Sequence, residues 1–158
     1  MKNFIFAIGI CAIILSIGMS ACRSKGTKQS EMSNETVTTI KDLVEKKWNL
    51  VELNGVDIST DHPNIAANAF IMFHAHGDER MVNGNSGCNN FSGTYSLGSG
   101  SELKFSGVAS TRMMCIDMTI EDQVNQLFQI VDNYTIQNGR LSLLQGETPL
   151  ARFLLESE

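Results

Sequence analysis

Short runs of alternating hydrophobic and polar residues recur from about residue 48 to the C-terminal end of the chain. A period of two places successive side chains on opposite faces of a strand, so each run predicts a β-strand with one buried face. In residues 102–106, for example, Leu103 and Phe105 fall on the same, inward face. The pattern predicts strands at residues 48–53, 69–76, 81–84, 93–97, 102–106, 134–137, 140–144 and 150–155.

One segment breaks this period. In residues 120–132 the apolar positions recur every three or four residues, which predicts an amphipathic helix. Thr119 is expected as its N-cap, and Glu121 and Asp122 follow in the first turn, where acidic side chains complement the helix dipole. The apolar positions are Ile120, Val124, Leu127, Phe128 and Val131.

Turn signals separate the strands. Asn54-Gly55 and Asn138-Gly139 are dipeptides typical of tight turns, and the second lies between two predicted strands as in a hairpin. Many short strands with one inserted α-helix favour a mainly β fold over a parallel α/β sheet. We therefore expect a compact antiparallel β-barrel or β-roll with lipocalin-like topology.

The N-terminal residues have the layout of an export signal. Lys2 provides a positive start, and residues 4–17 form an apolar core that is short for a bilayer about 30 Å thick. Such a segment is typical of a cleaved signal peptide, here residues 1–21, although a membrane anchor is the alternative.

The sequence Met19-Ser20-Ala21-Cys22 resembles the bacterial lipobox, with Met in place of the more usual Leu. The resemblance implies cleavage after Ala21 and lipidation of Cys22. Arg23, rather than Asp, follows the cysteine, so the common signal for retention in the inner membrane is missing. We expect an outer-membrane lipoprotein that faces the periplasm, with the lipid anchor as its contact with the membrane.

Composition divides the remaining chain into two parts. Residues 22–44 are polar and hold few large apolar side chains after Cys22, which predicts a flexible tether. Residues 45–158 are long enough for one hydrophobic core and form the predicted domain. This domain has seven basic and fourteen acidic residues, a net charge of −7 with neutral histidines. Because the basic residues are not clustered, we expect no nucleic-acid partner.

The chain has four cysteines, of which Cys11 leaves with the signal and Cys22 receives lipid. The remaining pair, Cys88 and Cys115, would lie in an oxidising compartment, which favours a disulfide. A nucleophilic thiol is a poorer interpretation because no histidine follows Cys88 in the sequence. Metal binding by the pair is also poorer, since neither cysteine belongs to a CxxC motif.

Two motifs suggest a family. Residues 84–95 read GNSGCNNFSGTY, and residues 109–115 read ASTRMMC; a helix and the strands around Tyr134 and Leu141 follow. This order resembles the META domain family of HslJ-like heat-shock lipoproteins, over about residues 48–155. The resemblance implies a compact β-barrel-like domain with the two motif cysteines close together, and a role in envelope stress or drug tolerance. It implies no catalytic residues.

The polar residues of these motifs have two interpretations. In the first, Gly87, Gly93 and Asn89 serve only the backbone geometry of tight turns. Alternatively, polar side chains form a rim over an apolar barrel mouth that binds a small apolar ligand. The candidate rim is Asn89, Asn90, Thr111 and Arg112, and the methionines that could line such a pocket, or simply fill the core, are Met72, Met81, Met113 and Met114.

No cofactor is predicted, and the prediction commits to no metal. His74 and His76 are expected on one face of a strand and come nearest to a metal site. Asp78 is the candidate third ligand, but it is unproven, because we expect Gly77 to turn the chain before it.

The sequence indicates a non-enzymatic binding or chaperone-like module that contacts an envelope protein. The alternative is an inhibitor of an envelope hydrolase, such as a lysozyme or a protease, acting through the loop at residues 54–67 with Asp57, Asp61 and His62. An enzyme is the least favoured interpretation, because no acid–base or nucleophile constellation is evident.

Overall fold

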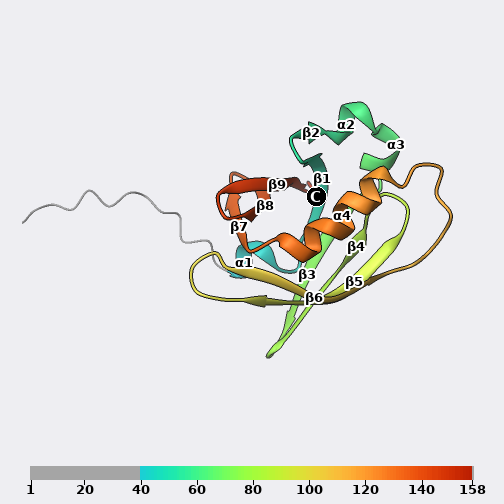
Figure 1. Cartoon of the computed structure of the whole chain (residues 1–158). Helices are drawn as coiled ribbons and strands as arrows, with labels where there is room; N and C mark the ends of the chain where they lie inside the picture. The colour runs from blue at the N-terminus through green and yellow to red at the C-terminus, as the bar shows by residue number, and fades with distance from the viewer. Residues whose placement is uncertain (1–39, 158) are drawn as a thin grey trace, which may run out of the picture. The chain divides into compact units, whose positions relative to one another are not determined.

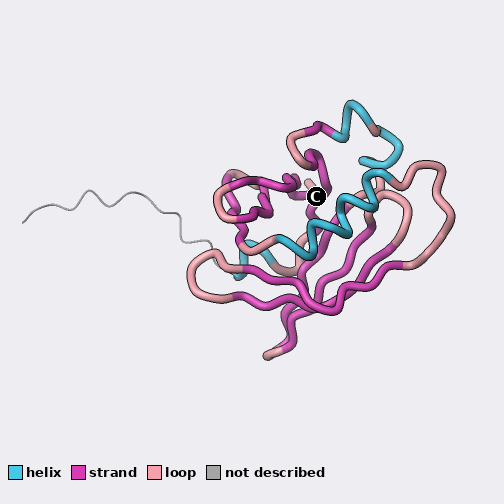
Figure 2. The backbone as a smooth tube through the Cα atoms, in the orientation of Figure 1, coloured by secondary structure: helices cyan, strands magenta, loops and turns pink. Residues whose placement is uncertain are grey.

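The computed structural model describes residues 40–157, which form a strongly curled antiparallel sheet with one longer helix across its concave side and three short helices (Figures 1 and 2). The strands are β1 (Lys47–Leu53), β2 (Val56–Asp57), β3 (Phe70–His76), β4 (Glu79–Asn85), β5 (Asn90–Leu97), β6 (Leu103–Ser110), β7 (Asn133–Gln137), β8 (Arg140–Gln145) and β9 (Thr148–Leu155). The helices are α1 (Ile40–Leu43), α2 (Ile58–Asp61), α3 (Pro63–Ala66) and α4 (Thr119–Ile130).

The sheet is a meander in which the first and last long strands are neighbours. Its order is β6-β5-β4-β3-β1-β9-β8-β7, and the short β2 pairs with β1 outside this path. Trp48 in β1 lies opposite Ile71 in β3 and opposite Leu155 in β9. Asn138 and Gly139 both have positive φ between β7 and β8, which confirms the predicted hairpin.

The two edge strands, β6 and β7, meet at one end only. Glu102 bridges to Asn133, and the Leu103 and Tyr134 amides donate across the same junction to Asp132 and Ser101. The sheet is therefore a half-barrel rather than a closed barrel. The chain passes from β6 to β7 through α4, which crosses the concave side of the sheet (Figure 1).

The apolar stripe of α4 fills the interior of this half-barrel. Every apolar position predicted to face inward on the helix is buried. The Phe128 ring lies 4.8 Å from Phe91 and 5.0 Å from Phe105, centroid to centroid. Phe73 continues this aromatic cluster to Tyr95 at 5.1 Å. The mainly β fold with one inserted amphipathic helix is thus confirmed.

Three details differ from the sequence predictions. The folded domain starts earlier than residue 45, because Leu43 is buried and its carbonyl accepts from the Trp48 indole at 3.0 Å. Thr119 is the first residue of α4 and not its cap; Asp117 Oδ1 accepts from the Thr119 amide at 2.8 Å instead. The short elements α1, α2, α3 and β2 were not predicted, because two to four residues are too few to show a period.

The predicted signal peptide, Cys22 and most of the predicted tether lie outside the described residues. Within residues 40–157, no helix is both long enough and apolar enough to span a membrane.

Candidate functional site

The two sequence motifs meet beside the N-terminus of α4. Cys88, after β4, and Cys115, in the loop that leads to α4, form a disulfide with their Cα atoms 6.3 Å apart. Gly87 has a φ of +106° and packs against Ile65, so its backbone conformation suits glycine. The disulfide ties the loop between β6 and α4 to the turn between β4 and β5.

Asn89 connects the same segments through hydrogen bonds and is fully buried. Its Oδ1 accepts from Thr111 Oγ1 at 2.8 Å and from the Met113 amide at 2.7 Å. Its Nδ2 donates to the Met113 carbonyl at 3.2 Å and to Glu121 Oε2 at 2.8 Å. One side chain therefore determines the path of the loop backbone and its distance from α4.

Glu121 is the acidic partner in this network and is 4% exposed. The predicted position of Glu121 in the first turn of the helix is confirmed, but its burial was not predicted. A signal was present: Glu121 precedes Val124 by three residues and Phe128 by seven, which puts it on the buried stripe. The Asn89 side-chain amide donates to this carboxylate, which lies in the first turn of α4.

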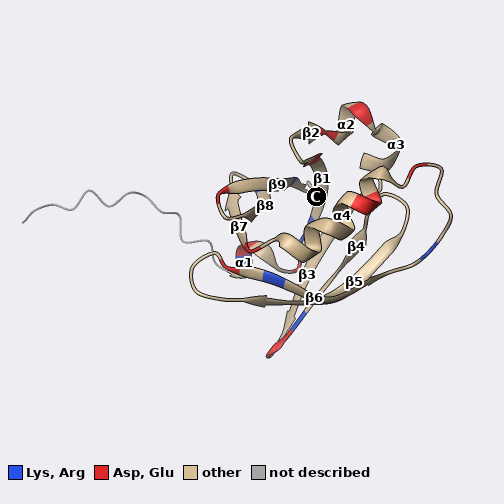
Figure 3. Ribbon diagram, in the orientation of Figure 1, with Lys and Arg blue, Asp and Glu red and all other residues tan. Residues whose placement is uncertain are grey.

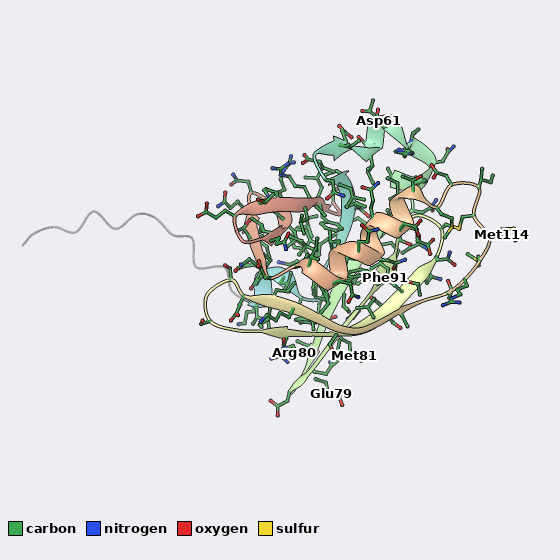
Figure 4. All side chains as sticks on the ribbon, viewed as in Figure 1. Asp61, Glu79, Arg80, Met81, Phe91 and Met114 are labelled. Carbon is green, nitrogen blue, oxygen red and sulfur yellow. A yellow bond between two sulfur atoms is a disulfide. The ribbon has the colours of Figure 1, made fainter. Side chains whose placement is uncertain are left out.

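The loop so anchored exposes a row of large apolar side chains. We call residues 111–118 the methionine loop. Met113 is 55% exposed, and Met114 and Ile116 have as much exposed surface as in an extended chain, with 101% and 109%. Figure 4 shows Met114 on the outer curve of this loop, well separated from Met81 near the β3–β4 hairpin. These methionines are neither core residues nor the lining of one shared pocket.

Two open grooves flank the methionine loop. The first, of about 650 Å³, runs between the end of β6 and α4 and includes Arg112, Met113 and Met118 in its walls. The second, of about 540 Å³, lies between α3 and the disulfide and includes Ile65, Met114 and Ile116. The loop thus contributes apolar side chains to a continuous stretch of surface on both of its sides.

The candidate rim is only partly at the surface. Asn90, Thr111 and Arg112 are exposed, and Thr111 and Arg112 line the larger groove. Asn89 is not a rim residue, because its side chain is consumed by the buried network. The core beneath contains about 10 Å³ of space, enough for one water at most, because α4 fills the interior where a lipocalin-like ligand would bind.

The loop at residues 54–67 lies beside the smaller groove and is held by contacts of its own. Ile58 is fully buried, and Asp57 caps α2 by accepting from the Ser59 amide and hydroxyl. The Ser59 hydroxyl holds the pKa of Asp57 below its usual value. Asp61 and His62 line the groove, and His62 Nδ1 lies 3.6 Å from Asp117 Oδ2.

A separate cluster of polar side chains lies at the end of β3. His74 Nδ1 is 2.9 Å from Glu45 Oε2, and potential ligand atoms of Glu45, His74 and His76 lie within 4.8 Å of one another. The hydrogen bond with His74 lowers the pKa of Glu45. Asp78 is not part of the cluster, since the chain turns at Gly77, where φ is +59°. The sequence missed Glu45 because it lies 29 residues from His74.

Charge is spread thinly over the domain. Figure 3 shows Lys and Arg positions scattered singly over the strands and loops of the described ribbon, with acidic residues near α2, at the start of α4 and at the tip of the β3–β4 hairpin.

Solved structures share this fold. An NMR structure of a protein from Burkholderia xenovorans has a TM-score of 0.57 at 22% identity, covering 75% of this chain and 86% of that one. A crystal structure of a DUF4847 family protein from Bacteroides vulgatus has a TM-score of 0.52 at 14% identity, covering 73% of this chain and 96% of the other. At such identities the likeness shows the fold alone.

Sequence relatives extend the comparison. Heat shock protein HslJ of Escherichia coli is 28% identical over 141 residues, which span 88% of this chain and 84% of HslJ. The profile of the META domain matches residues 41–157, which include both motifs, the disulfide and all the strands. The chain therefore belongs to the META domain family.

Proposed function

We propose that this chain is a lipid-anchored, non-enzymatic binding module of the bacterial envelope, which holds exposed apolar segments of other envelope proteins. The methionine loop is the observation that carries this proposal, since Met114 and Ile116 are fully exposed on an otherwise well-packed domain. Lipidation of Cys22 would anchor the module to the outer membrane on the periplasmic side. The name of its relative, a heat shock protein, supports a role under stress.

Methionine suits a surface that must accept many partners. Its unbranched, polarizable side chain adapts to irregular apolar shapes, and methionine-rich surfaces are used by promiscuous binding proteins. The loop presents Met113, Met114 and Met118 together with Ile116. A surface of this kind favours binding of varied apolar segments over one fixed ligand.

The expected affinity is low. Complete burial of one such side chain contributes about 1.5–3 kcal/mol, and part of this gain is offset by the loss of translational and rotational freedom on association. Met114 and Ile116 alone therefore support weak and reversible contacts. Reversible binding is what a module needs if it is to release a segment for folding.

The chemistry beside the loop favours binding over catalysis. Cys88 and Cys115 are joined and offer no thiolate. The Glu121 carboxylate is buried and accepts from Asn89 at 2.8 Å, which commits it to holding the loop. The disulfide and the Glu121–Asn89 hydrogen bond therefore serve to hold the loop in place.

An inhibitor of an envelope hydrolase is the second candidate. The ordering of residues 54–67 by the buried Ile58 and the capped α2 favours it, because a rigid loop can enter an active site at low entropic cost. Asp61 projects from this loop at the top of Figure 4. This candidate requires one specific partner and dependence on Asp61 or His62.

A matched pair of variants tests the proposal. The first is the double variant Met114→Ser with Ile116→Ser. Because both side chains are exposed in the wild type, the free energy of unfolding should change by less than about 0.5 kcal/mol. The full-length variant should lose the ability to slow aggregation of an envelope protein unfolded by heat without a reductant. Met81→Ser is the control, because Met81 is 49% exposed on another part of the surface. Equal activity of the double variant and the wild type would reject the proposal.

A further inference from the structure

At the end of β3, Glu45 lies along the edge of the strand that β1 no longer covers. The β1–β3 pairing covers residues 47–49 and 70–72. Beyond it, Glu45 takes the place of a strand: its amide donates to the Phe73 carbonyl at 2.8 Å, and its Oε1 accepts from the Ala75 amide at 3.2 Å. The backbone at Glu45 has a φ of +55°, which is uncommon for a residue other than glycine. The carboxylate is therefore held in place by β3.

The same carboxylate faces two histidines. His74 and His76 are two residues apart on β3 and so project from one face of the strand. Ligand atoms of Glu45, His74 and His76 all lie within 4.8 Å of one another, and His74 Nδ1 is 2.9 Å from Glu45 Oε2. A tetrahedral metal ion bound at about 2.0–2.2 Å from each ligand needs neighbouring ligand atoms between 3 and 4 Å apart, which small rotations of exposed side chains can provide.

Asn83 supplies the partner that orients a metal-binding histidine. His74 Nε2 lies 3.1 Å from Asn83 Oδ1, which accepts a hydrogen bond. With a proton on Nε2, the lone pair of Nδ1 points at the Glu45 carboxylate, another acceptor. In that tautomer Nδ1 is free to coordinate a metal ion beside the Glu45 carboxylate. Metal-ligating histidines commonly donate their other N–H to such an oxygen.

We propose that Glu45, His74 and His76 form a binding site for a divalent transition-metal ion of the Zn²⁺ type. Two imidazoles and one carboxylate favour zinc, copper or nickel over calcium or magnesium, which prefer all-oxygen sites. Three protein ligands leave the fourth position of zinc to water. The site is distinct from the methionine loop and does not depend on the proposed binding function.

The bound ion would join the start of the domain to the β3–β4 hairpin. Glu45 lies two residues before β1, and His76 pairs with Glu79 at the β3–β4 turn. Since an ion that binds only the folded state stabilises it, zinc is expected to raise the unfolding temperature. The site would therefore make the stability of the domain depend on zinc concentration.

Calorimetric titration of the full chain with ZnCl₂ tests this proposal, using protein that carries no histidine tag. We expect one site per chain in the wild type, and an affinity at least about tenfold lower in His74→Ala and in His76→Ala. His62→Ala removes the remaining histidine, which lies outside the cluster, and should bind as the wild type does. Because His76 is exposed, its variant should fold, and its unfolding temperature without zinc should match that of the wild type.

Asn83→Ala adds a test of geometry. This variant keeps all three ligands, so it should keep one site while its affinity falls about tenfold to a hundredfold. Absence of a binding heat in the wild type, with no zinc-induced rise in unfolding temperature, would overturn the proposal. Undiminished binding by His76→Ala would overturn it as well.

Discussion

Replacing Asn89 by Ala should destabilise the domain by about 3–5 kcal/mol. The side chain is fully buried, and it satisfies the Thr111 hydroxyl, the Met113 amide and the Glu121 carboxylate. Alanine would remove these hydrogen bonds and leave the part-buried Met113 amide and the buried Glu121 carboxylate without these partners. Each such group costs about 1–3 kcal/mol, and more when it is charged. Against a total stability of about 5–15 kcal/mol, this loss is large.

The assay is equilibrium unfolding of the oxidised protein in guanidinium chloride, with Asn90→Ala as the matched control. Asn90 is the exposed neighbour of Asn89, so its loss should cost less than about 1 kcal/mol. Asn89→Asp separates hydrogen bonding from packing: it keeps the shape but replaces the donor 2.8 Å from Glu121 Oε2 by an acceptor. It should therefore be as destabilising as alanine near neutral pH. A loss below about 1 kcal/mol in Asn89→Ala would refute the role given to this network.

Three further predictions concern the same region. Gly87→Ala should cost about 1–3 kcal/mol, measured by thermal unfolding, because its φ of +106° is strained for alanine; an unchanged melting temperature would contradict this. Replacing Cys88 and Cys115 by Ser should lower the free energy of unfolding by about 3–4 kcal/mol in the chain-entropy model, since the disulfide spans 27 residues. Asp57 has a lowered pKa, so it contributes stability that is present above its ordinary value of 3.8 and lost as the pH falls through the lower folded-state value. Asp57→Asn should flatten the acid limb of a stability–pH curve, and a limb identical to that of the wild type would argue against the cap.

Much of the fold follows from periodicity. Alternation in β3 separates buried Ile71 and Phe73 from their neighbours, and the helical spacing of α4 identifies the face that packs against Phe91. These predictions hold because side-chain period is a local property that burial enforces directly. The meander order also follows, since antiparallel neighbours joined by short turns need little chain between them.

The polar site was harder to predict for a physical reason. Asn89 was placed at a rim because asparagine is usually exposed, whereas here its partners Thr111, Met113 and Glu121 lie 22–32 residues away. Long-range hydrogen bonds leave no period in a sequence. The same holds for Glu45 and His74, which meet only because the chain before β1 extends along β3. The exposure of Met114 was also not predicted, since methionine in a sequence more often indicates a core position.

The open side of the half-barrel explains the positions of both α4 and the methionine loop. Because β6 and β7 meet only at one end, the connection between them must cross the opening, and α4 fills it. The loop before α4 cannot then pack inside. The disulfide and Asn89 hold it outside at a fixed place, so its apolar side chains remain available for a partner.

The most direct test of the proposed function is site-specific photo-crosslinking in intact cells. A photoreactive residue at position 114 reports contacts of the methionine loop, and the same residue at position 81 reports an exposed surface elsewhere (Figure 4). We expect crosslinks from position 114 to many envelope proteins, increasing on heat shock, and few from position 81. A single envelope hydrolase recovered in near-equal amount would support the inhibitor instead. Equal crosslinking from both positions, or none from position 114, would contradict the account.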